Sequence, residues 1–334
     1  MGDKIKVRKF TLASIILLGI NSILGTGIFL LPGKAMALIG PASILMYMVV
    51  TIVVLAIAFC FAECASYFER NGAAYLYAKE AFGDFIGFEI GIMKWAVGII
   101  AWATIAVGFL TALEQLIPEI GVGLMRPFLL TTFLSGLGFL NVRGVRNIRF
   151  LSNVFSMGKI VPLALFLFFG MFYIESDNFY PLVPPDTDLT AFGAAGLLIF
   201  FAFSGFEGLA VAAEEMDNPK RNLPLAIFAI ITITAVLYLF TQFIVVGILG
   251  PALAESDVPL ALAAEKIGGS YGMWMVMICM LISSAGTNLA ASFIAPRSGV
   301  ALAQDGMISK RISLPGKFGT PTLAIIITTV LTIV

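Results

Sequence analysis

Eight apolar runs, each close to the length that crosses a lipid bilayer as a helix, constrain this sequence more than any other feature. A transmembrane helix needs about 20 apolar residues. Of the 334 residues, 60% are hydrophobic and only 12% are charged, well below the charged share of a soluble domain. The sequence therefore predicts an all-α integral membrane protein. The runs cover residues 12–38, 42–68, 86–117, 127–142, 150–174, 192–215, 224–249 and 271–303.

A ninth apolar run begins near Thr322 and reaches Val334. It is shorter than a full span and has no polar tail. We therefore expect a chain that is truncated or only partly present, and that stops within its ninth span.

The basic residues predict the orientation. With the N-terminus inside the cell, 15 of the 20 lysines and arginines fall in inner segments, and only Arg126 and Lys266 fall in outer loops. Lys34, Lys94 and Lys159 fall within spans. Cytoplasmic loops carry such an excess of basic residues, so we expect a multi-pass protein of the cell membrane with a cytoplasmic N-terminus. The inner residues are Lys4, Lys6, Arg8, Lys9, Arg70, Lys79, Arg143, Arg146, Arg149, Lys220, Arg221, Arg297, Lys310, Arg311 and Lys317.

Glycine-rich segments interrupt the first and the sixth run near their middles. The first reads Gly-Thr-Gly at 25–27, and the second reads Ser-Gly-Phe-Glu at 204–207. Glycine permits non-helical geometry and a close approach to the backbone, although one glycine pair in a span is usually only close packing. Two interruptions five spans apart are more informative, because an odd number of spans per repeat makes the second repeat cross the membrane upside down. We expect a LeuT-like five-span inverted repeat, with a first repeat at 1–174, a second, incomplete repeat at 175–334, and discontinuous helices 1 and 6.

Opposite helix ends would meet at these interruptions. The outer half of the first span begins near Gly27 with free N–H groups and a positive dipole end, which suits a carboxylate. Its inner half ends near Ile23, and the outer half of the sixth span ends near Ser204, so both leave carbonyl groups for an ammonium group. This arrangement predicts a site for the zwitterion of an α-amino acid.

Five sequence segments carry a more specific signal: INSILGTGIF (20–29), FAECASYFERNGAAYLY (61–77), FAFSGFEG (201–208), EEMDNPKRNLPLAI (214–227) and PRSGVALAQDGMISK (296–310). Over essentially the whole chain, the sequence resembles the amino acid–polyamine–organocation (APC) superfamily of permeases, which have the LeuT-type fold. The resemblance implies secondary transport of amino acids. Thr26 stands where the family usually has serine, and it keeps the hydroxyl group.

The resemblance also implies roles for individual residues. Backbone N–H groups at residues 25–27 would hold the substrate carboxylate, while carbonyl groups at Ile23, Phe201 and Ser204 would hold its amino group. The aromatic ring of Phe201 would act as a gate over the substrate. The substrate-binding residues so implied are Ile23, Gly25, Thr26, Gly27, Phe201, Ser204 and Gly205.

Two charged residues lie inside predicted spans near the interruptions. Lys159 lies about 15 Å of helix beyond Arg149, so its ammonium group requires a partner or a function. It is either a fixed cation that supports the broken part of the first span, or a proton-linked or sodium-substituting coupling group. Glu207 is expected to accept from free N–H groups where the inner half of the sixth span begins, with substrate contact or proton carriage as the alternative. Five other charged residues are expected in salt links towards the cytoplasmic side, without a substrate role: Glu63, Glu89, Lys94, Glu214 and Glu215.

The leading hypothesis is a secondary carrier that works by alternating access, with protons or by exchange. A channel needs a continuous polar or charged pore lining, which the few intramembrane charges of this chain do not form. An enzyme needs a clustered nucleophile, base or metal set, and the chain has no histidine. No phosphate-binding loop points to ATP, and no basic patch points to nucleic acid.

We expect an amino acid substrate, a surrounding lipid membrane and, for a symporter, protons, with no catalytic residue, metal or cofactor. No counter-charge stands out in the pocket, which favours neutral amino acids. Two alternatives stay open: a membrane sensor that binds an amino acid without transport, and a carrier of polyamines or cationic amino acids.

Overall fold

The computed structural model describes residues 9–114, 116–121, 123–185 and 187–334, so the inner residues Lys4, Lys6 and Arg8 lie outside the described part. Within these ranges the only β contact is one parallel bridge between Phe10 and Met216. The predicted all-α, multi-pass membrane architecture is confirmed, because six helical segments are long and apolar enough to cross a membrane. They are Gly27–Tyr67, Asp84–Glu114, Val145–Tyr173, Leu189–Glu215, Pro219–Glu255 and Pro259–Gln304.

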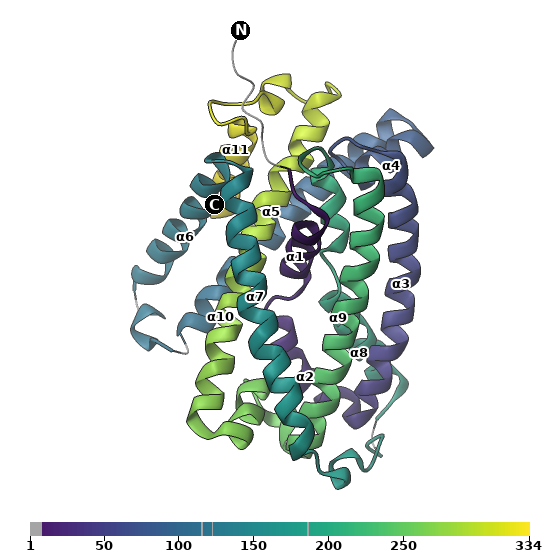
Figure 1. Cartoon of the computed structure of the whole chain (residues 1–334), viewed down its shortest axis with the longest axis vertical. Coiled ribbons are helices and arrows are strands. Elements are labelled where there is room, and N and C mark those ends of the chain that lie inside the picture. The colour runs from purple at the N-terminus through teal and green to yellow at the C-terminus, as the bar shows by residue number, and fades with distance from the viewer. Residues whose placement is uncertain (1–8, 115, 122, 186) are drawn as a thin grey trace.

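Both predicted interruptions are present in the structure. The first run forms α1 (Leu12–Ile23) and α2 (Gly27–Ile39), and Figure 1 shows the purple chain leaving its helical path between them. The sixth run forms α8 (Leu189–Ala202) and a 3-10 helix, η5 (Phe206–Glu215). Regular helix is therefore absent from residues 24–26 and 203–205.

The remaining long helices follow the predicted runs to within a few residues. They are α3 (Ser43–Tyr67), α5 (Asp84–Glu114), α6 (Met125–Val142), α7 (Val145–Gly170), α9 (Pro219–Leu249) and α11 (Thr322–Ile333). Short 3-10 helices join or extend them: η1 (Gly40–Ala42), η2 (Pro118–Gly121), η3 (Met171–Tyr173), η4 (Ser176–Phe179), η6 (Gly250–Glu255) and η7 (Lys310–Ser313).

Two helical regions were not predicted. The short helix α4 (Ala74–Phe82) lies between α3 and α5. The eighth predicted run begins at 271, but α10 (Pro259–Gln304) begins at Pro259 and changes direction at Gly269, where φ is +59°. Charged residues in both regions, such as Lys79 and Glu265, break the apolar pattern that marks a span, although they are compatible with helix.

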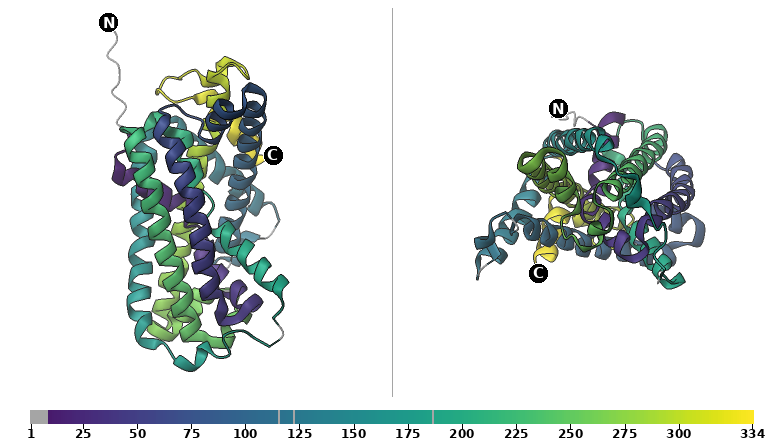
Figure 2. Two further views of the ribbon diagram at one scale, coloured as in Figure 1. Left: turned by 90° about the vertical axis from the view of Figure 1, so that its right-hand side faces the viewer. Right: turned by 90° about the horizontal axis from the view of Figure 1, so that it is seen from below.

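Helix α10 forms the centre of the bundle, and α1 packs on α7, α9 and α10. Helices α3 and α9 form a second long pair, and α11 packs on α6. Figure 2 shows a tall bundle from the side and, from below, helices grouped around this centre. The two interrupted helices therefore lie among straight helices that hold them in place.

Four connections meet at one end of the bundle, at the top of Figure 1. They join α3 to α4, α6 to α7, η5 to α9 and α10 to α11, and we call this end the basic end because Arg70, Lys79 and Arg143 lie in or beside these connections. Phe10 is fixed here, since its N–H donates to the Glu215 carbonyl at 2.9 Å and its own carbonyl accepts from Asp217 at 2.9 Å. The first described residues are thus attached to the end of the sixth run.

Candidate functional site

The two helix breaks touch each other. The Ser22 hydroxyl, in the last turn of α1, donates to the carbonyl of Gly205 at 3.1 Å and to that of Gly19 at 3.0 Å. Gly205 has φ of +117°, and a Cβ atom at this position would lie 2.6 Å from the Ser22 carbonyl oxygen. Only glycine fits both constraints without strain. The two breaks, far apart in the sequence, are therefore in direct contact in the structure.

Free backbone amides lie at the start of α2. In the described part of the chain, the amides of Thr26 and Gly27 find no hydrogen-bond acceptor, and both residues are partly exposed. The Gly25 amide differs, because it donates to the Ile23 carbonyl at 2.9 Å. Two predicted substrate groups, the Gly25 amide and the Ile23 carbonyl, are therefore bonded to each other in this structure. The free amides of Thr26 and Gly27 suit an anion at the positive end of the helix dipole.

Three side chains converge on the carbonyl of Leu24, directly after α1. It accepts from Lys159 Nζ at 2.5 Å, from the Ser283 hydroxyl at 2.7 Å and from the Thr287 hydroxyl at 3.2 Å. An unbroken helix would present this carbonyl to the amide of Ile28. The three side chains replace that missing backbone bond and thereby stabilise the break.

Lys159 is fully buried, and its second bond goes to the carbonyl of Ser283 at 3.2 Å. It lies in a polar stripe along α7 in which Ser152 accepts from Asn21 and Ser156 donates to the Leu17 carbonyl at 2.7 Å. Both serines are also fully buried. The stripe attaches α1 to α7 along its length and ends at the break.

The end of α8 also leaves carbonyl groups, and most of them have partners. The carbonyl of Ala202 accepts from the Tyr238 hydroxyl at 2.9 Å. The carbonyl of Phe201 accepts from the Ser204 amide at 3.1 Å and from its hydroxyl at 2.7 Å. Ser204 is exposed, and among the described residues its own carbonyl accepts no hydrogen bond. That carbonyl is the one best placed to accept from an ammonium group.

The aromatic side chains of the sixth run divide into two groups. Phe203 is 1% exposed and packs edge-on against Tyr238, with ring centroids 5.0 Å apart. Phe206 is also buried and packs edge-on against Phe61. Phe201 is instead 74% exposed. Phe201 thus lies outside the packing that holds the other two rings, and its gate role stays a prediction.

Glu207 holds the second break. Its Oε2 accepts from the Gly205 amide at 2.8 Å, which is the expected role for a carboxylate at the start of this inner segment. Its Oε1 lies 3.3 Å from Lys94 Nζ, which the sequence did not predict. Ten residues of α5, about 15 Å of helix, separate Lys94 from Asp84 at the start of the helix. The ion pair therefore lies within the membrane-spanning part.

Of the four glutamates predicted in salt links, only Glu215 forms one in the described part of the chain, with Arg297 at 2.9 Å. Glu214 instead accepts from Gln304 at 3.2 Å, Glu63 accepts from the Tyr67 hydroxyl at 3.1 Å, and Glu89 has no ion-pair partner among the described residues. Arg297, one of the predicted inner basic residues, is fully buried in the last turns of α10, with its guanidinium 4.0 Å from the centroid of the Phe293 ring. An additional hydrogen bond to Asn141 at 2.9 Å satisfies this buried cation.

Four residues of the site were missed by sequence reasoning: Ser22, Ser283, Thr287 and Lys94. Ser283 and Thr287 are four apart in the eighth run, and this helical spacing places them on one face. Polar residues at that spacing in an apolar run are a usable signal. The partners of Ser22 and Lys94 lie 183 and 113 residues away in sequence, so no local pattern identifies them.

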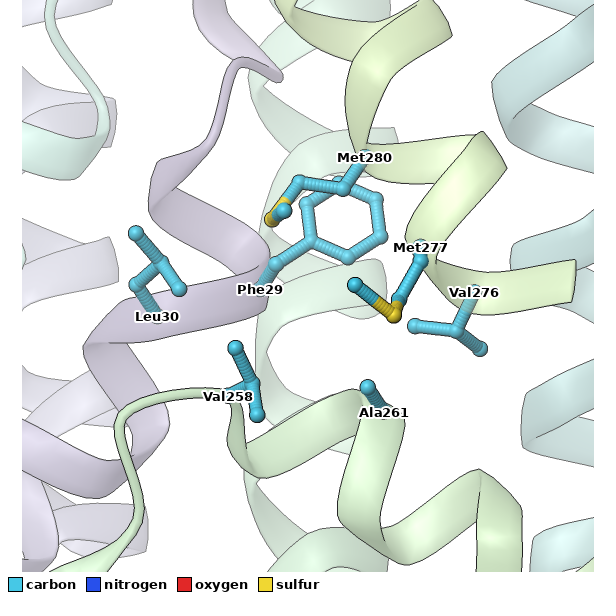
Figure 3. A pocket seen from close by; sticks show the side chains of 7 residues that line it. All are labelled: Phe29, Leu30, Val258, Ala261, Val276, Met277 and Met280. Atoms are coloured by element: carbon cyan, nitrogen blue, oxygen red, sulfur yellow. The ribbon is translucent and has the colours of Figure 1, made fainter. Parts of the chain in front are cut away.

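A small apolar cavity of about 10 Å³ lies beside the outer half of the first run (Figure 3). It is enclosed by seven side chains from α2, α10 and the residue before α10: Phe29, Leu30, Val258, Ala261, Val276, Met277 and Met280. This volume holds about one water molecule, and none of the predicted substrate residues lines it. The cavity is a packing gap and not the substrate site.

Comparison with known proteins identifies the family of the chain. Residues 10–334 match the family described as amino acid permease. An uncharacterized transporter of Mycobacterium tuberculosis is 33% identical over 96% of this chain and 72% of its own length. The methylthioribose transporter of Bacillus subtilis is 27% identical, covering 95% of this chain and 70% of its own length, and a branched-chain amino acid permease of the same organism is 26% identical, covering 97% and 73%.

The match extends over nearly the whole described chain, including both helix breaks. The relatives carry transporter and permease names, which agrees with the absence of enzyme-like residue clusters in the sequence. The chain is thus a multi-pass membrane transporter and not an enzyme, and it belongs to the amino acid permease family of the APC superfamily.

Proposed function

We propose that this protein carries neutral amino acids across the cell membrane by alternating access, and that the two helix breaks bind the α-amino and α-carboxyl groups. The observation that carries the proposal is the pair of free amides at Thr26 and Gly27 beside a second break that touches the first through Ser22 and Gly205. An anion is favoured at the amides, and an ammonium group at the Ser204 carbonyl. Both halves of a zwitterion then fit within one site.

The inverted repeat is part of the same proposal. Residues 1–174 would form one five-span unit and residues 175–334 part of a second, crossing in the opposite sense. Support comes from the matching positions of the two breaks, which occur in the first and sixth runs. Alternating access would then rock one set of helices about the breaks, as inverted-repeat carriers do.

The orientation follows from the basic end. We propose that this end faces the cytoplasm, since connections at this end carry most of the inner basic residues while outer loops carry Arg126 and Lys266. The N-terminus would then be cytoplasmic. A single cysteine introduced at Lys9, labelled from either side of the membrane, tests this placement.

Lys159 has two roles under this proposal. It holds the Leu24 carbonyl and so stabilises the break, and it occupies the position of a coupling cation without a carboxylate partner in bonding distance among the described residues. Intramembrane ionisable residues in transporters commonly serve in coupling. Proton symport and exchange are the two modes that fit.

The test is uptake by the intact protein in proteoliposomes, with and without an inward proton gradient. Leucine, alanine, lysine, glutamate, spermidine and isoamylamine serve as competitors. We expect saturable uptake that neutral amino acids inhibit and that isoamylamine, which lacks the carboxyl group, does not. Binding without uptake would instead indicate a sensor, and inhibition by spermidine or isoamylamine would indicate an amine carrier.

A further inference from the structure

The Lys94–Glu207 ion pair has a position unlike the salt bridges of the basic end. Lys94 comes from the middle of α5, while Glu207 lies two residues after Gly205, the glycine at the second break. The inner segment η5 packs on α1, α3, α9 and α10. Helix α5 reaches this segment here through the long Lys94 side chain.

Both partners are accessible. The side chains of Lys94 and Glu207 are 33% and 25% exposed, whereas Arg297 in the neighbouring Arg297–Glu215 pair is 0% exposed. The second oxygen of Glu207 bonds to the Gly205 amide, and the Gly205 carbonyl bonds to Ser22 in the first break. A charge on Glu207 is therefore connected to both breaks by two hydrogen bonds.

The charges near the breaks then decide which substrates are tolerated. Without Lys94, the Glu207 carboxylate would be an accessible negative charge next to the second break. In a partly dry site such a charge attracts a cationic group far more strongly than in water. Lys94 cancels this charge, and Lys159, the other basic residue beside the breaks, is bonded to the Leu24 and Ser283 carbonyls. A substrate with a cationic side chain finds no counter-charge.

We propose that Lys94 determines charge selectivity: by neutralising Glu207 it excludes cationic side chains and restricts the site to neutral amino acids. The proposal rests on the proposed amino acid transport. It differs from a merely structural ion pair in what it predicts, because loss of a structural contact lowers the uptake of every substrate alike. Selectivity by charge instead changes the ratio of inhibition by lysine to inhibition by glutamate. Removing the positive charge should raise this ratio, and removing the negative charge should lower it.

The experiment measures inhibition of leucine uptake by lysine, leucine and glutamate in proteoliposomes for four variants and the wild type. Lys94→Met leaves Glu207 unpaired, so we expect lysine to gain at least about tenfold in inhibition relative to leucine. Glu207→Gln keeps an acceptor for the Gly205 amide but leaves Lys94 unpaired, and glutamate should gain instead. The double variant Lys94→Met/Glu207→Gln removes both charges and should return to the neutral preference. Lys94→Arg keeps the charge, so its ratio of lysine to leucine inhibition should stay at the wild-type value.

Inhibition ratios that stay at the wild-type value in Lys94→Met and Glu207→Gln would overturn the proposal, even if uptake falls. Size-exclusion elution and melting temperature verify folding for each variant. If Lys94→Met fails to fold, Glu207→Gln and the double variant still test the proposal. Inhibition by glutamate relative to leucine must rise in Glu207→Gln and must stay at the wild-type value in the double variant. Failure of the proposed function is separate, since the wild type itself would then bind and carry no amino acid.

Discussion

The Nζ atom of Lys159 lies 2.5 Å from the carbonyl oxygen of Leu24, the residue directly after α1. The ammonium group of a residue on α7 thus donates to the backbone carbonyl that the break after α1 leaves without a helical partner. Ser283 and Thr287 bond to the same oxygen from a third helix. The break is consequently a built feature held from two sides.

Replacing Lys159 by alanine tests this link. We expect Lys159→Ala to abolish uptake or to remove its dependence on a proton gradient, because the Leu24 carbonyl loses its charged donor. Lys34→Ala is the matched control, since Lys34 is exposed on α2 and should leave uptake near the wild-type value. Substrate exchange that persists without gradient-driven uptake would indicate coupling, and loss of binding would indicate structural support. Uptake and pH dependence that match the wild type would contradict both roles.

The two breaks require glycine at position 205. An alanine there would place its Cβ 2.6 Å from the Ser22 carbonyl oxygen at a φ of +117°, and a strained backbone of this kind costs about 1 to 3 kcal/mol. We expect Gly205→Ala to lower the melting temperature and to weaken substrate binding. In Gly193→Ala, within the preceding helix α8, the new Cβ meets no atom within 4 Å. The hypothesis of touching breaks fails if Gly205→Ala and Gly193→Ala behave alike in binding measurements.

Alanine substitutions at Phe201 and Phe203 compare the predicted gate residue with a residue of the packed core. Phe201 is 74% exposed, so Phe201→Ala should weaken substrate affinity and leave the melting temperature unchanged. Phe203 is 1% exposed, and truncating a buried phenylalanine costs about 3 to 5 kcal/mol. Phe203→Ala should therefore unfold at lower temperature. Calorimetric binding and thermal melting of both variants provide the test, and wild-type affinity in Phe201→Ala would argue against the gate.

Asp305 gives the basic end a measurable acid sensitivity. It bonds to Arg70, to Lys79 at 2.8 Å and to the Tyr75 hydroxyl at 2.9 Å. Burial alone would raise the pKa of Asp305, but the bonds from Lys79, Arg70 and Tyr75 outweigh it and lower the pKa from 3.8 to about 2. Since the folded-state pKa is lowered, the stabilisation is present above about pH 4 and is lost as the pH falls towards 2.

Asp305→Asn should therefore cost about 1 to 2 kcal/mol of unfolding free energy at pH 7, allowing for partial solvent screening, and about half as much near pH 3. Melting of the detergent-solubilised protein between pH 7 and pH 3 provides the measurement. Asp84→Asn is the control, because the Asp84 side chain is 75% exposed and its bond to Lys79 is 3.4 Å long. An equal effect of the two substitutions at pH 7 would show that the Asp305 cluster adds no stability.

The sequence by itself determined the membrane class, the number of long apolar runs and the places where two of them break. These properties depend on local composition: apolar length for the bilayer, and glycine where a helix must depart from its path. The search for apolar runs missed α4 and the first part of α10, because charged residues there interrupt the apolar pattern of a span. It also did not reveal that Lys94 pairs with Glu207 or that Arg297 is fully buried, since nothing in the neighbouring residues shows which helices pack alongside.

Only the tertiary structure decided which atoms meet at the breaks. Ser22 and Gly205 are 183 residues apart, Lys159 and Leu24 are 135 apart, and Lys94 and Glu207 are 113 apart. A broken helix exposes backbone groups that must be satisfied away from water, and the satisfying groups come from whichever helices pack alongside. Packing also placed Phe201 on the exposed side and Phe203 in the core, although both belong to one apolar run. Sequence thus fixes where the chain must break, and packing determines the chemistry at the break.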